Sequence, residues 1–317
     1  MSDMKVTVSS CWTEAEGVRA IELVAPDGGN LPSFEAGAHI DVHLPGVGVR
    51  SYSLCASPDD LSRYELGVLK EPSSRGGSLA MHALQAGDEL EIDFPSNHFP
   101  MAPAGASHVF FAGGIGVTPF VAMAMQAQAR GDRCRMHYAV RSRAKAAYLG
   151  RVQALLGERL SLHVDDEAQG VFDVTAALDG LGADEHIYVC GPQAFMEAIL
   201  GAARGRGIAE DRLHWEYFNL EVPLAQDGDA PFELHLSVSG LTLQVPVDQT
   251  IVQVCAEAGV DVLVSCEQGV CGTCISSVIE GTPDHRDAYL TPQERADGKL
   301  ILPCCSRSKT PKLVLEL

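Results

Sequence analysis

Three cysteines within nine residues constrain this chain more than any other feature. The stretch is residues 266–274, CEQGVCGTC, and a further cysteine, Cys304, follows with twenty-nine residues between it and Cys274. Four thiolates can converge on one point only if the loop that carries three of them wraps closely around that point. Gly269 and Gly272 lie where a side chain would intrude on such a centre.

This C-x4-C-x2-C…C spacing is typical of a plant-type [2Fe–2S] centre. We therefore predict Cys266, Cys271, Cys274 and Cys304 as the metal ligands, with backbone N–H groups of the loop hydrogen-bonded to the cluster sulfurs. Zinc is a weaker alternative because it usually takes two close pairs of ligands rather than three cysteines in one loop. Counting alone leaves Cys304 and its neighbour Cys305 open as the fourth ligand.

Length and charge set the broad class. The 317 residues allow two or three domains, and the net charge of −19 makes nucleic acid and anionic membranes poor partners. The N-terminus shows no signal peptide, so we expect a cytoplasmic protein whose ten cysteines are reduced or bind metal. Residues 109–129 carry no charge, but three glycines and Pro119 indicate a buried strand, turn and helix rather than a membrane span.

Residues 1–103 are predicted to form a small antiparallel β-barrel. Short segments of alternating polarity are separated by turn signals, as such barrels require. The segments are Lys5–Ser10, Arg19–Val24, His39–Leu44, Arg50–Cys55, Tyr64–Leu69 and Glu89–Phe94.

Two sites in this region contain residues suited to binding a ligand. Arg50, Tyr52 and Ser53 combine a phosphate ligand, an aromatic ring and a hydroxyl on one strand. The Gly76-Gly77-Ser78 turn opens a short helical segment, whose free N–H groups form either an anion site or an ordinary cap.

Residues 104–225 are predicted to be an α/β domain with a parallel sheet. The strands are expected at His108–Ala112, Arg135–Val140, Leu160–Val164, Glu185–Cys190 and Leu213–Tyr217, and the helices at Val117–Ala129, Ala144–Leu156, Phe172–Leu178 and Pro192–Arg204. Gly113 to Pro119 form the first strand-to-helix turn, where glycines let the backbone approach a pyrophosphate. Cys190-Gly191-Pro192 ends a later strand, at the edge where ligands collect. Arg141 and Arg143 could accept the 2′-phosphate of NADP, contact the adenosine ribose or simply be solvated, and the sequence leaves all three open.

Residues 230–317 follow a small, polar linker at 225–230. We predict a hairpin at Phe232–Val238 and Leu241–Val247, a helix at Thr250–Ala258 capped by Thr250, and strands at Ser277–Glu280, Leu300–Cys304 and Leu313–Leu317. The fold class is therefore multidomain, with a β-barrel, an α/β parallel-sheet domain and an α+β domain.

The motifs of the first two domains resemble those of the ferredoxin-reductase superfamily. The resemblance implies that Arg50, Tyr52 and Ser53 hold a flavin, that Val68 to Lys70 line the isoalloxazine edge, and that Gly76, Gly77 and Ser78 contact the flavin phosphate. It further implies nucleotide contacts from Gly114, Gly116, Thr118, Pro119, Cys190, Gly191 and Pro192. Phe218 matches the aromatic that stacks on the flavin, with Tyr217 as the fallback.

The third domain resembles a plant-type ferredoxin, and the order of the three domains over the whole chain resembles the phthalate dioxygenase reductase family. Segments 284–287, DHRD, and 304–307, CCSR, are most similar to the vanillate demethylase reductase components of that family. This resemblance favours Cys304 over Cys305. It also implies FMN rather than FAD, NADH as the donor, and a Rieske-type oxygenase that acts on a small, typically aromatic, compound as the partner.

The chemistry of the parts gives the expected mechanism. NADH gives two electrons as hydride whereas an iron–sulfur centre takes one, and a flavin divides the pair. No side chain need act as an acid, base or nucleophile, so no catalytic residue is predicted. The alternatives are a self-contained NAD(P)H dehydrogenase that reduces a small acceptor such as a quinone, and a colourless zinc-stabilised binding protein.

Overall fold

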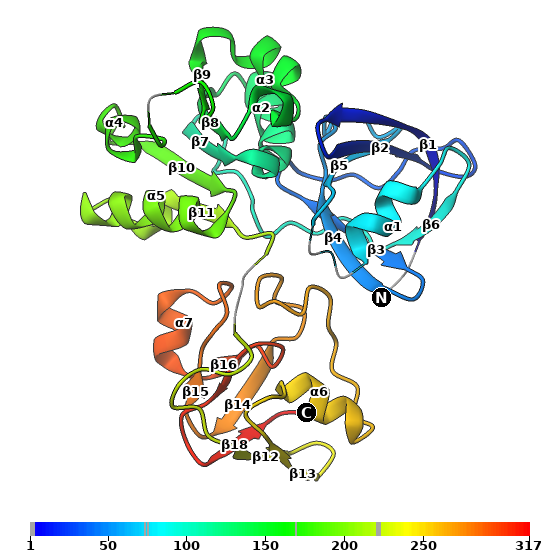
Figure 1. Cartoon of the computed structure of the whole chain (residues 1–317), viewed down its shortest axis with the longest axis vertical. Helices are drawn as coiled ribbons and strands as arrows, with labels where there is room; N and C mark the ends of the chain where they lie inside the picture. Colours follow the sequence, from blue (N-terminus) through cyan, green and yellow to red (C-terminus); the bar gives the residue numbers. More distant parts are fainter. Residues whose placement is uncertain (1–3, 73, 75, 169, 220–222) are drawn as a thin grey trace. The chain divides into compact units, whose positions relative to one another are not determined.

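The computed structural model describes the chain except for residues 1–3, 73, 75, 169 and 220–222. The chain divides into two compact units, Met1–Phe218 and Asn219–Leu317 (Figure 1). The first unit contains two sheets and the second contains the cysteine loop. The finer division at 1–103, 104–225 and 230–317 remains a prediction.

The first sheet is antiparallel and has six strands in the order β4-β3-β6-β1-β2-β5. An isolated bridge between Leu54, just after β4, and Leu66 of β5 connects the two edge strands and closes the barrel. Helix α1 packs beside β5, and its Met81 lies in the barrel core. The bounds are β1 Met4–Ala15, β2 Val18–Val24, β3 His39–Leu44, β4 Gly48–Ser53, β5 Tyr64–Leu69, α1 Gly77–Ala83 and β6 Glu89–Ile92.

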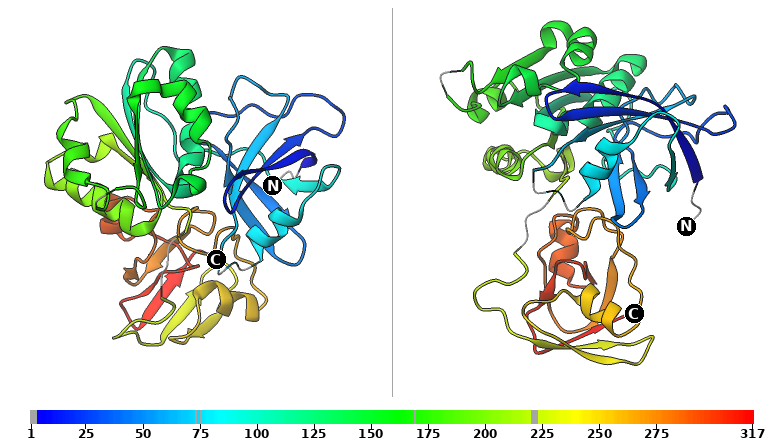
Figure 2. Two further views of the ribbon diagram at one scale, coloured as in Figure 1. Left: turned by 45° about the horizontal axis from the view of Figure 1, so that its top comes forward. Right: turned by 45° about the vertical axis from the view of Figure 1, so that its right-hand side comes forward.

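The second sheet is parallel, with its five strands in the order β11-β10-β7-β8-β9. Its central strand β7 is buried on both faces, which explains the apolar run at 109–113 within it. Phe110 belongs to the core cluster that includes α2 and α3, and Phe111 belongs to the cluster that includes α4 and α5. The helices therefore cover both faces, as Figures 1 and 2 show.

The bounds in this sheet and its helices are β7 Ser107–Gly113, η1 Gly114–Val117, α2 Thr118–Arg130, β8 Arg133–Val140, η2 Arg143–Lys145, α3 Leu149–Leu156, η3 Gly157–Arg159, β9 Leu160–Val164, α4 Val174–Asp179, β10 Glu185–Cys190, α5 Gln193–Gly205, η4 Glu210–Arg212 and β11 Leu213–Glu216.

The second unit has a mixed sheet with the order β13-β12-β18-β14-β16 and a separate pair, β15-β17. Thr250 caps α6 in a capping box with Gln253, which confirms the predicted cap. The bounds are β12 Phe232–Leu236, β13 Thr242–Val245, α6 Ile251–Glu257, β14 Ser276–Glu280, β15 Pro283–Asp284, α7 Pro292–Asp297, β16 Leu300–Ile301, β17 Arg307–Ser308 and β18 Lys312–Leu315.

Several elements differ from the sequence predictions in their bounds, and three of the differences are informative. The helix predicted at Ala144–Leu156 begins only at Leu149, because Tyr148 adopts a left-handed conformation (φ 56°) and interrupts it. The strand predicted at Leu300–Cys304 ends at Ile301, and a turn carries Cys304 toward the cysteine loop. Helix α7 was not predicted, although the Thr291 and Glu294 capping box that begins it is visible in the sequence.

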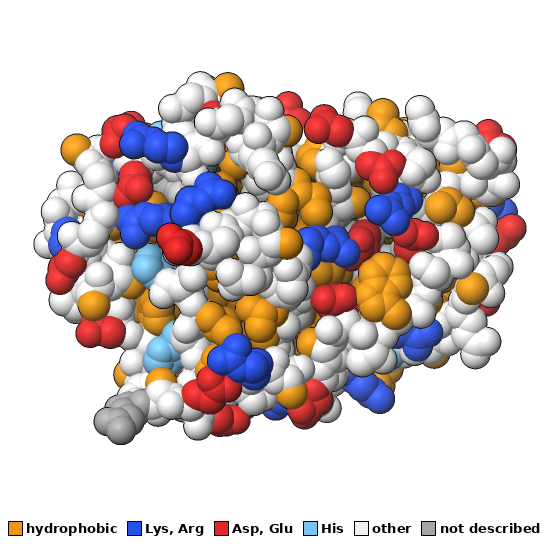
Figure 3. Space-filling view, turned by 90° about the horizontal axis from the view of Figure 1, so that it is seen from above, with side chains coloured by type: hydrophobic (Ala, Val, Ile, Leu, Met, Phe, Trp, Pro, Cys, Tyr) orange, Lys and Arg blue, Asp and Glu red, His pale blue; other side chains and the backbone are white. Residues whose placement is uncertain are grey.

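The surface has mixed charge. On the face in Figure 3, acidic and basic side chains lie close to one another, with hydrophobic side chains between them. Within the described part of the chain, no helix has both the length and the apolar character that a membrane span needs.

Candidate functional site: cysteine loop, flavin barrel and nucleotide edge

The four predicted cluster ligands form two pairs of side chains. Cys266 hydrogen-bonds the Cys271 sulfur, which lowers the pKa of Cys271 and raises the pKa of Cys266. Cys274 and Cys304 form the second hydrogen-bonded pair. No three His, Cys, Asp or Glu side chains of the described residues are grouped to hold a single metal ion. Two thiol pairs instead fit a cluster with two irons and four cysteine ligands.

The two glycines of the loop are required by close packing. Gly269 and Gly272 both have left-handed backbone angles, φ 73° and 77°. A Cβ on Gly269 would lie 2.5 Å from the Cys305 sulfur, and a Cβ on Gly272 would overlap the Tyr289 ring. The loop is therefore pressed against the segment 287–289 on one side, and the Ala288 N–H donates to the Gly269 carbonyl at 2.9 Å.

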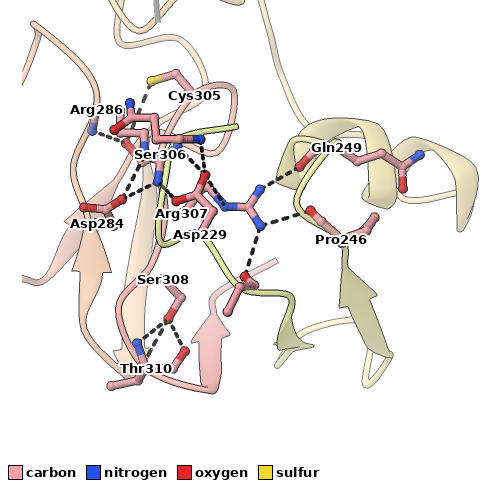
Figure 4. A network of polar contacts seen from close by, with 12 residues as sticks. Asp229, Pro246, Gln249, Asp284, Arg286, Cys305, Ser306, Arg307, Ser308 and Thr310 are labelled. Carbon is pink, nitrogen blue, oxygen red and sulfur yellow. Dashed lines mark hydrogen bonds and ion pairs between the residues drawn. The ribbon is translucent and has the colours of Figure 1, made fainter. Parts of the chain in front are cut away.

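A network of paired charges surrounds Arg286, close to Cys305 and Ser306 (Figure 4). Arg286 pairs with Asp229 and with Asp284, at 3.0 Å from Nη1 to Asp229 Oδ2 and 2.8 Å from Nε to Asp284 Oδ2. Its backbone N–H donates to Ser306 Oγ at 3.2 Å, next to the turn that carries Cys304. Buried charges are stable only when they are paired in this way, so the network holds the segment around Arg286 against Asp229 and Ser306.

Arg307 extends the network to the start of α6. Its guanidinium donates to the carbonyls of Gln249 and Pro246, both at 3.0 Å. These bonds explain why an arginine can be almost fully buried here.

The structure separates the roles of Cys304 and Cys305. Cys304 is buried, and its side chain is hydrogen-bonded to that of Cys274. The Cys305 sulfur instead lies 3.8 Å from the Leu302 carbonyl and packs against Gly269. The assignment of Cys304 as the ligand is supported by this arrangement. Both residues lie in a turn rather than in a strand.

In the barrel, the structure brings the two predicted flavin motifs together. A Cβ on Gly77, the first residue of α1, would lie 2.9 to 3.2 Å from atoms of the Arg50 side chain. Arg50 therefore extends across the start of α1, where Gly76 is left-handed at φ 99°. A cation beside free helix N–H groups can hold a phosphate. Arg75, which precedes the Gly76-Gly77-Ser78 turn, lies outside the described residues.

Two further predicted residues have protein partners. Ser78 Oγ accepts a hydrogen bond from the Glu71 N–H at 3.1 Å, and the Val68 carbonyl accepts one from His82 Nε2 at 2.9 Å. These bonds hold α1 against β5, and Lys70, just after β5, is exposed. Tyr52 is mostly buried, and burial raises the pKa of its phenol to about 12, so it stays neutral at physiological pH.

A buried carboxyl group that the sequence argument missed lies beside Ser53. The Ser53 hydroxyl hydrogen-bonds the Glu216 carboxyl, and burial raises the pKa of Glu216 to about 8. Glu216 Oε2 has no hydrogen-bond partner among the described residues and no exposed surface. An unpaired buried oxygen of this kind marks a place where a ligand can donate or accept a hydrogen bond.

Glu216 also lies next to Cys190, one of the predicted nucleotide contacts. Cys190 of β10 and Glu216 of β11 are adjacent in the sheet. Burial raises the pKa of the Cys190 thiol, and the negative charge of ionised Glu216 raises it further, by a smaller amount. Cys190 is therefore an un-ionised, buried thiol. Ser53, Cys190 and Glu216 bring the barrel and the parallel sheet together at one point.

The first strand-to-helix turn packs against the second. A Cβ on Gly116 would overlap the Cys190 carbonyl, and a Cβ on Gly113 would lie 2.8 Å from the Pro192 ring. Gly114 has φ 53°, and no atom lies within 4 Å of a Cβ built on it, so its outer side is open. A ligand can approach the backbone there.

Thr118 and Pro119 are buried at the start of α2. Thr118 Oγ1 donates to the Ile115 carbonyl at 3.0 Å, and its methyl group packs on Gly67 of β5. Thr118 stays a predicted nucleotide contact, and its hydroxyl already has a protein partner. Gly67 is a contact that the sequence argument missed.

Phe218 and Tyr217 follow β11 and differ in exposure. Tyr217 packs against the hydrophobic core of the α4 and α5 face, whereas Phe218 is 38% exposed. The exposed ring is the one available for stacking on a planar ligand. This difference supports Phe218 over Tyr217.

Comparison with known proteins gives matches along the whole chain. Residues 234–309 match the 2Fe-2S iron-sulfur cluster binding domain family. Residues 97–213 match the family of the dimethylamine monooxygenase subunit DmmA-like N-terminal domain. The vanillate O-demethylase oxidoreductase of Pseudomonas putida is 45% identical over 307 residues, which cover 96% of each chain.

Two solved structures are also similar. The phthalate dioxygenase reductase structure, described as modular for electron transfer from pyridine nucleotides to [2Fe-2S], has a TM-score of 0.76 and 33% identity over 100% of this chain and 98% of that chain. An intact type IV self-sufficient cytochrome P450 monooxygenase has a TM-score of 0.86 and 37% identity over 99% of this chain. This chain spans 41% of that longer protein.

Proposed function

We propose that this chain carries electrons from NADH through FMN and a [2Fe–2S] cluster to a Rieske-type oxygenase. The proposal follows from its family, because the chain belongs to the family of the vanillate O-demethylase oxidoreductases and phthalate dioxygenase reductase. The observation that carries the proposal is the presence of two complete ligand sets in one polypeptide. The first unit has flavin and nucleotide motifs that meet at Ser53 and Glu216. The second unit has four cysteines arranged as two pairs.

Each part of the first unit has a distinct task. Arg50 and the start of α1 hold the flavin phosphate, and the open backbone at Gly114 receives the coenzyme pyrophosphate. Phe218 would stack on the flavin ring and so control the access of the nicotinamide to it. The bound flavin supplies the chemistry that accepts hydride and releases single electrons.

Glu216 controls charge next to the flavin ring. Its pKa of about 8 keeps the carboxyl protonated at neutral pH, so Glu216 would place no negative charge beside a bound flavin. The Ser53 hydroxyl fixes the orientation of the carboxyl, and Oε2 is left to bond the ligand.

In the second unit, the chain supplies thiolates and excludes side chains from the cluster. Gly269 and Gly272 let the loop approach the irons, and the Arg286 network holds the segment around Arg286 in place. We place this reaction in the cytoplasm, since no disulfide joins any of the ten cysteines, all of them described residues, and a reducing compartment keeps cysteines available to bind metal.

The experiment uses the holoprotein and a Cys271→Ser variant. We expect the variant to lose iron–sulfur absorbance and all transfer to a Rieske oxygenase, while NADH still bleaches its flavin. Wild-type protein should reduce the oxygenase with NADH as the sole donor.

The same pair of proteins tests the alternative function. If the chain is a self-contained dehydrogenase for a quinone, turnover with the quinone is rapid in both proteins and neither reduces an oxygenase. Loss of flavin reduction together with the cluster would contradict the independent roles of the two units.

A further inference from the structure

Two turns lie side by side at the carboxyl edge of the parallel sheet. They follow β8 and β9, which are neighbours in parallel register. The Asp165 N–H donates to the Val140 carbonyl at 2.9 Å, and the Asp166 N–H donates to the Arg141 carbonyl at 3.1 Å. The backbone therefore fixes the two turns to each other.

This edge is where the adenosine end of the coenzyme has to lie if the proposed function is right. β8 adjoins β7, whose turn at 113–116 is the pyrophosphate site. In open parallel sheets that bind dinucleotides, a side chain near the end of the adjacent strand contacts the adenosine ribose, through an acid for the 2′-OH or an arginine for a 2′-phosphate. The turn after β8 carries Arg141 and Arg143.

The guanidinium of Arg143 is already engaged. Its Nε donates to Glu167 Oε1 at 2.9 Å and its Nη2 donates to Glu167 Oε2 at 2.7 Å. This is a two-pronged bond, the same geometry that an arginine would use to hold a phosphate. Both side chains are about half exposed, 58% and 52%, so the pair stands at the surface where a ligand can reach it.

The remaining charges of the two turns balance. Arg141 and Lys145 are exposed near Arg143, and Asp165 and Asp166 are exposed near Glu167. His163 Nε2 lies 3.2 Å from Asp165 Oδ1. With Arg143 and Glu167 included, three cations face three acids. A phosphate monoester brings nearly two negative charges, and this edge has no excess of positive charge to receive them.

We infer that Glu167 makes the coenzyme site select NADH over NADPH. It occupies the fork of Arg143 and places a carboxylate where the 2′-phosphate of NADPH would lie, whereas the neutral 2′-OH of NADH is tolerated. Glu167 is a specificity residue and takes no part in hydride transfer.

The test is Glu167→Gln in the holoprotein, with flavin reduction by NADH and by NADPH measured separately. Removing the charge frees the Arg143 fork, so the ratio of kcat/KM for NADPH to that for NADH should rise about tenfold. The change should lie in the KM for NADPH, with kcat for NADH unchanged. Glu158→Gln is the matched control, because Glu158 is also exposed but lies in η3, at the other end of β9.

A double variant, Glu167→Gln with Arg143→Ala, tests the mechanism. The gain with NADPH should disappear, and 2′,5′-ADP should inhibit only the single variant more strongly than wild type. An unchanged coenzyme ratio in Glu167→Gln, or an equal change in Glu158→Gln, would overturn the inference and leave the proposed function standing. A wild-type holoprotein whose flavin is reduced by neither coenzyme would overturn both.

Discussion

Replacing Glu216 with Gln should stabilise the first unit at neutral and alkaline pH. Below pH 4.5, both the folded and the unfolded chain carry the proton of Glu216, so the group has no effect on stability. Between pH 4.5 and about 8 the folded chain keeps a proton that the unfolded chain has lost. Stability therefore falls as pH rises through this window and stays low above it.

The size of the effect follows from the pKa difference. The pKa rises from 4.5 to about 8 on folding, and each unit of pH corresponds to about 1.4 kcal/mol. At pH 7 the pH lies 2.5 units above the unfolded-state pKa of 4.5. The loss of folding stability caused by Glu216 is therefore at most roughly 3.5 kcal/mol. For a unit of this size, that limit corresponds to a difference in Tm of about 7–14 °C.

Tryptophan fluorescence can follow this unit alone, because Trp12 and Trp215 both belong to it. Flavin-free wild-type, Glu216→Gln and Glu158→Gln proteins should be melted from pH 5 to pH 8.5. The Tm of Glu216→Gln should approach that of the other two near pH 5 and exceed theirs increasingly as the pH rises. Parallel curves for all three proteins would refute the argument that Glu216 is held protonated by burial.

Three other changes test separate parts of the account. Gly272→Ala should abolish cluster assembly, because its Cβ would overlap the Tyr289 ring at a backbone φ of 77°. Gly259 has a similar φ of 76° but open space around it, so Gly259→Ala should load iron normally. Equal iron content in the two variants would contradict the packing argument. Arg50→Ala should lower the flavin content of the purified protein at least severalfold, whereas the exposed Arg63→Ala should not, and full flavin occupancy in Arg50→Ala would remove that residue from the phosphate site. Phe218→Ala should change the KM for NADH by exposing the flavin ring, and unchanged stopped-flow kinetics would exclude it from the stack.

The patterns that depend on neighbouring residues could be predicted from the sequence. Alternation of apolar residues located β3, β5, β9 and β10 with their observed bounds, and the cap at Thr250 located α6. The cysteine spacing contains the ligand chemistry itself, so the loop could be interpreted before its geometry was known.

The contacts that arise only in three dimensions could not be predicted. Glu216 ends a strand like any solvated acid, and only the pairing of β10 with β11 and the packing of Ser53 bury its carboxyl. Tyr289 and Gly272 are far enough apart along the chain that no local pattern connects them. The break at Tyr148 has a similar origin, since its backbone N–H is held by Glu14 from β1 at 3.0 Å.

Anaerobic titration of the holoprotein with NADH tests the central claim most directly. A flavin takes two electrons and a [2Fe–2S] cluster takes one, so complete bleaching of both should require about 1.5 equivalents of NADH per chain. The electron paramagnetic resonance signal of the reduced cluster should appear during the same titration. An end point at about one equivalent, with flavin bleached and no cluster signal, would contradict the account.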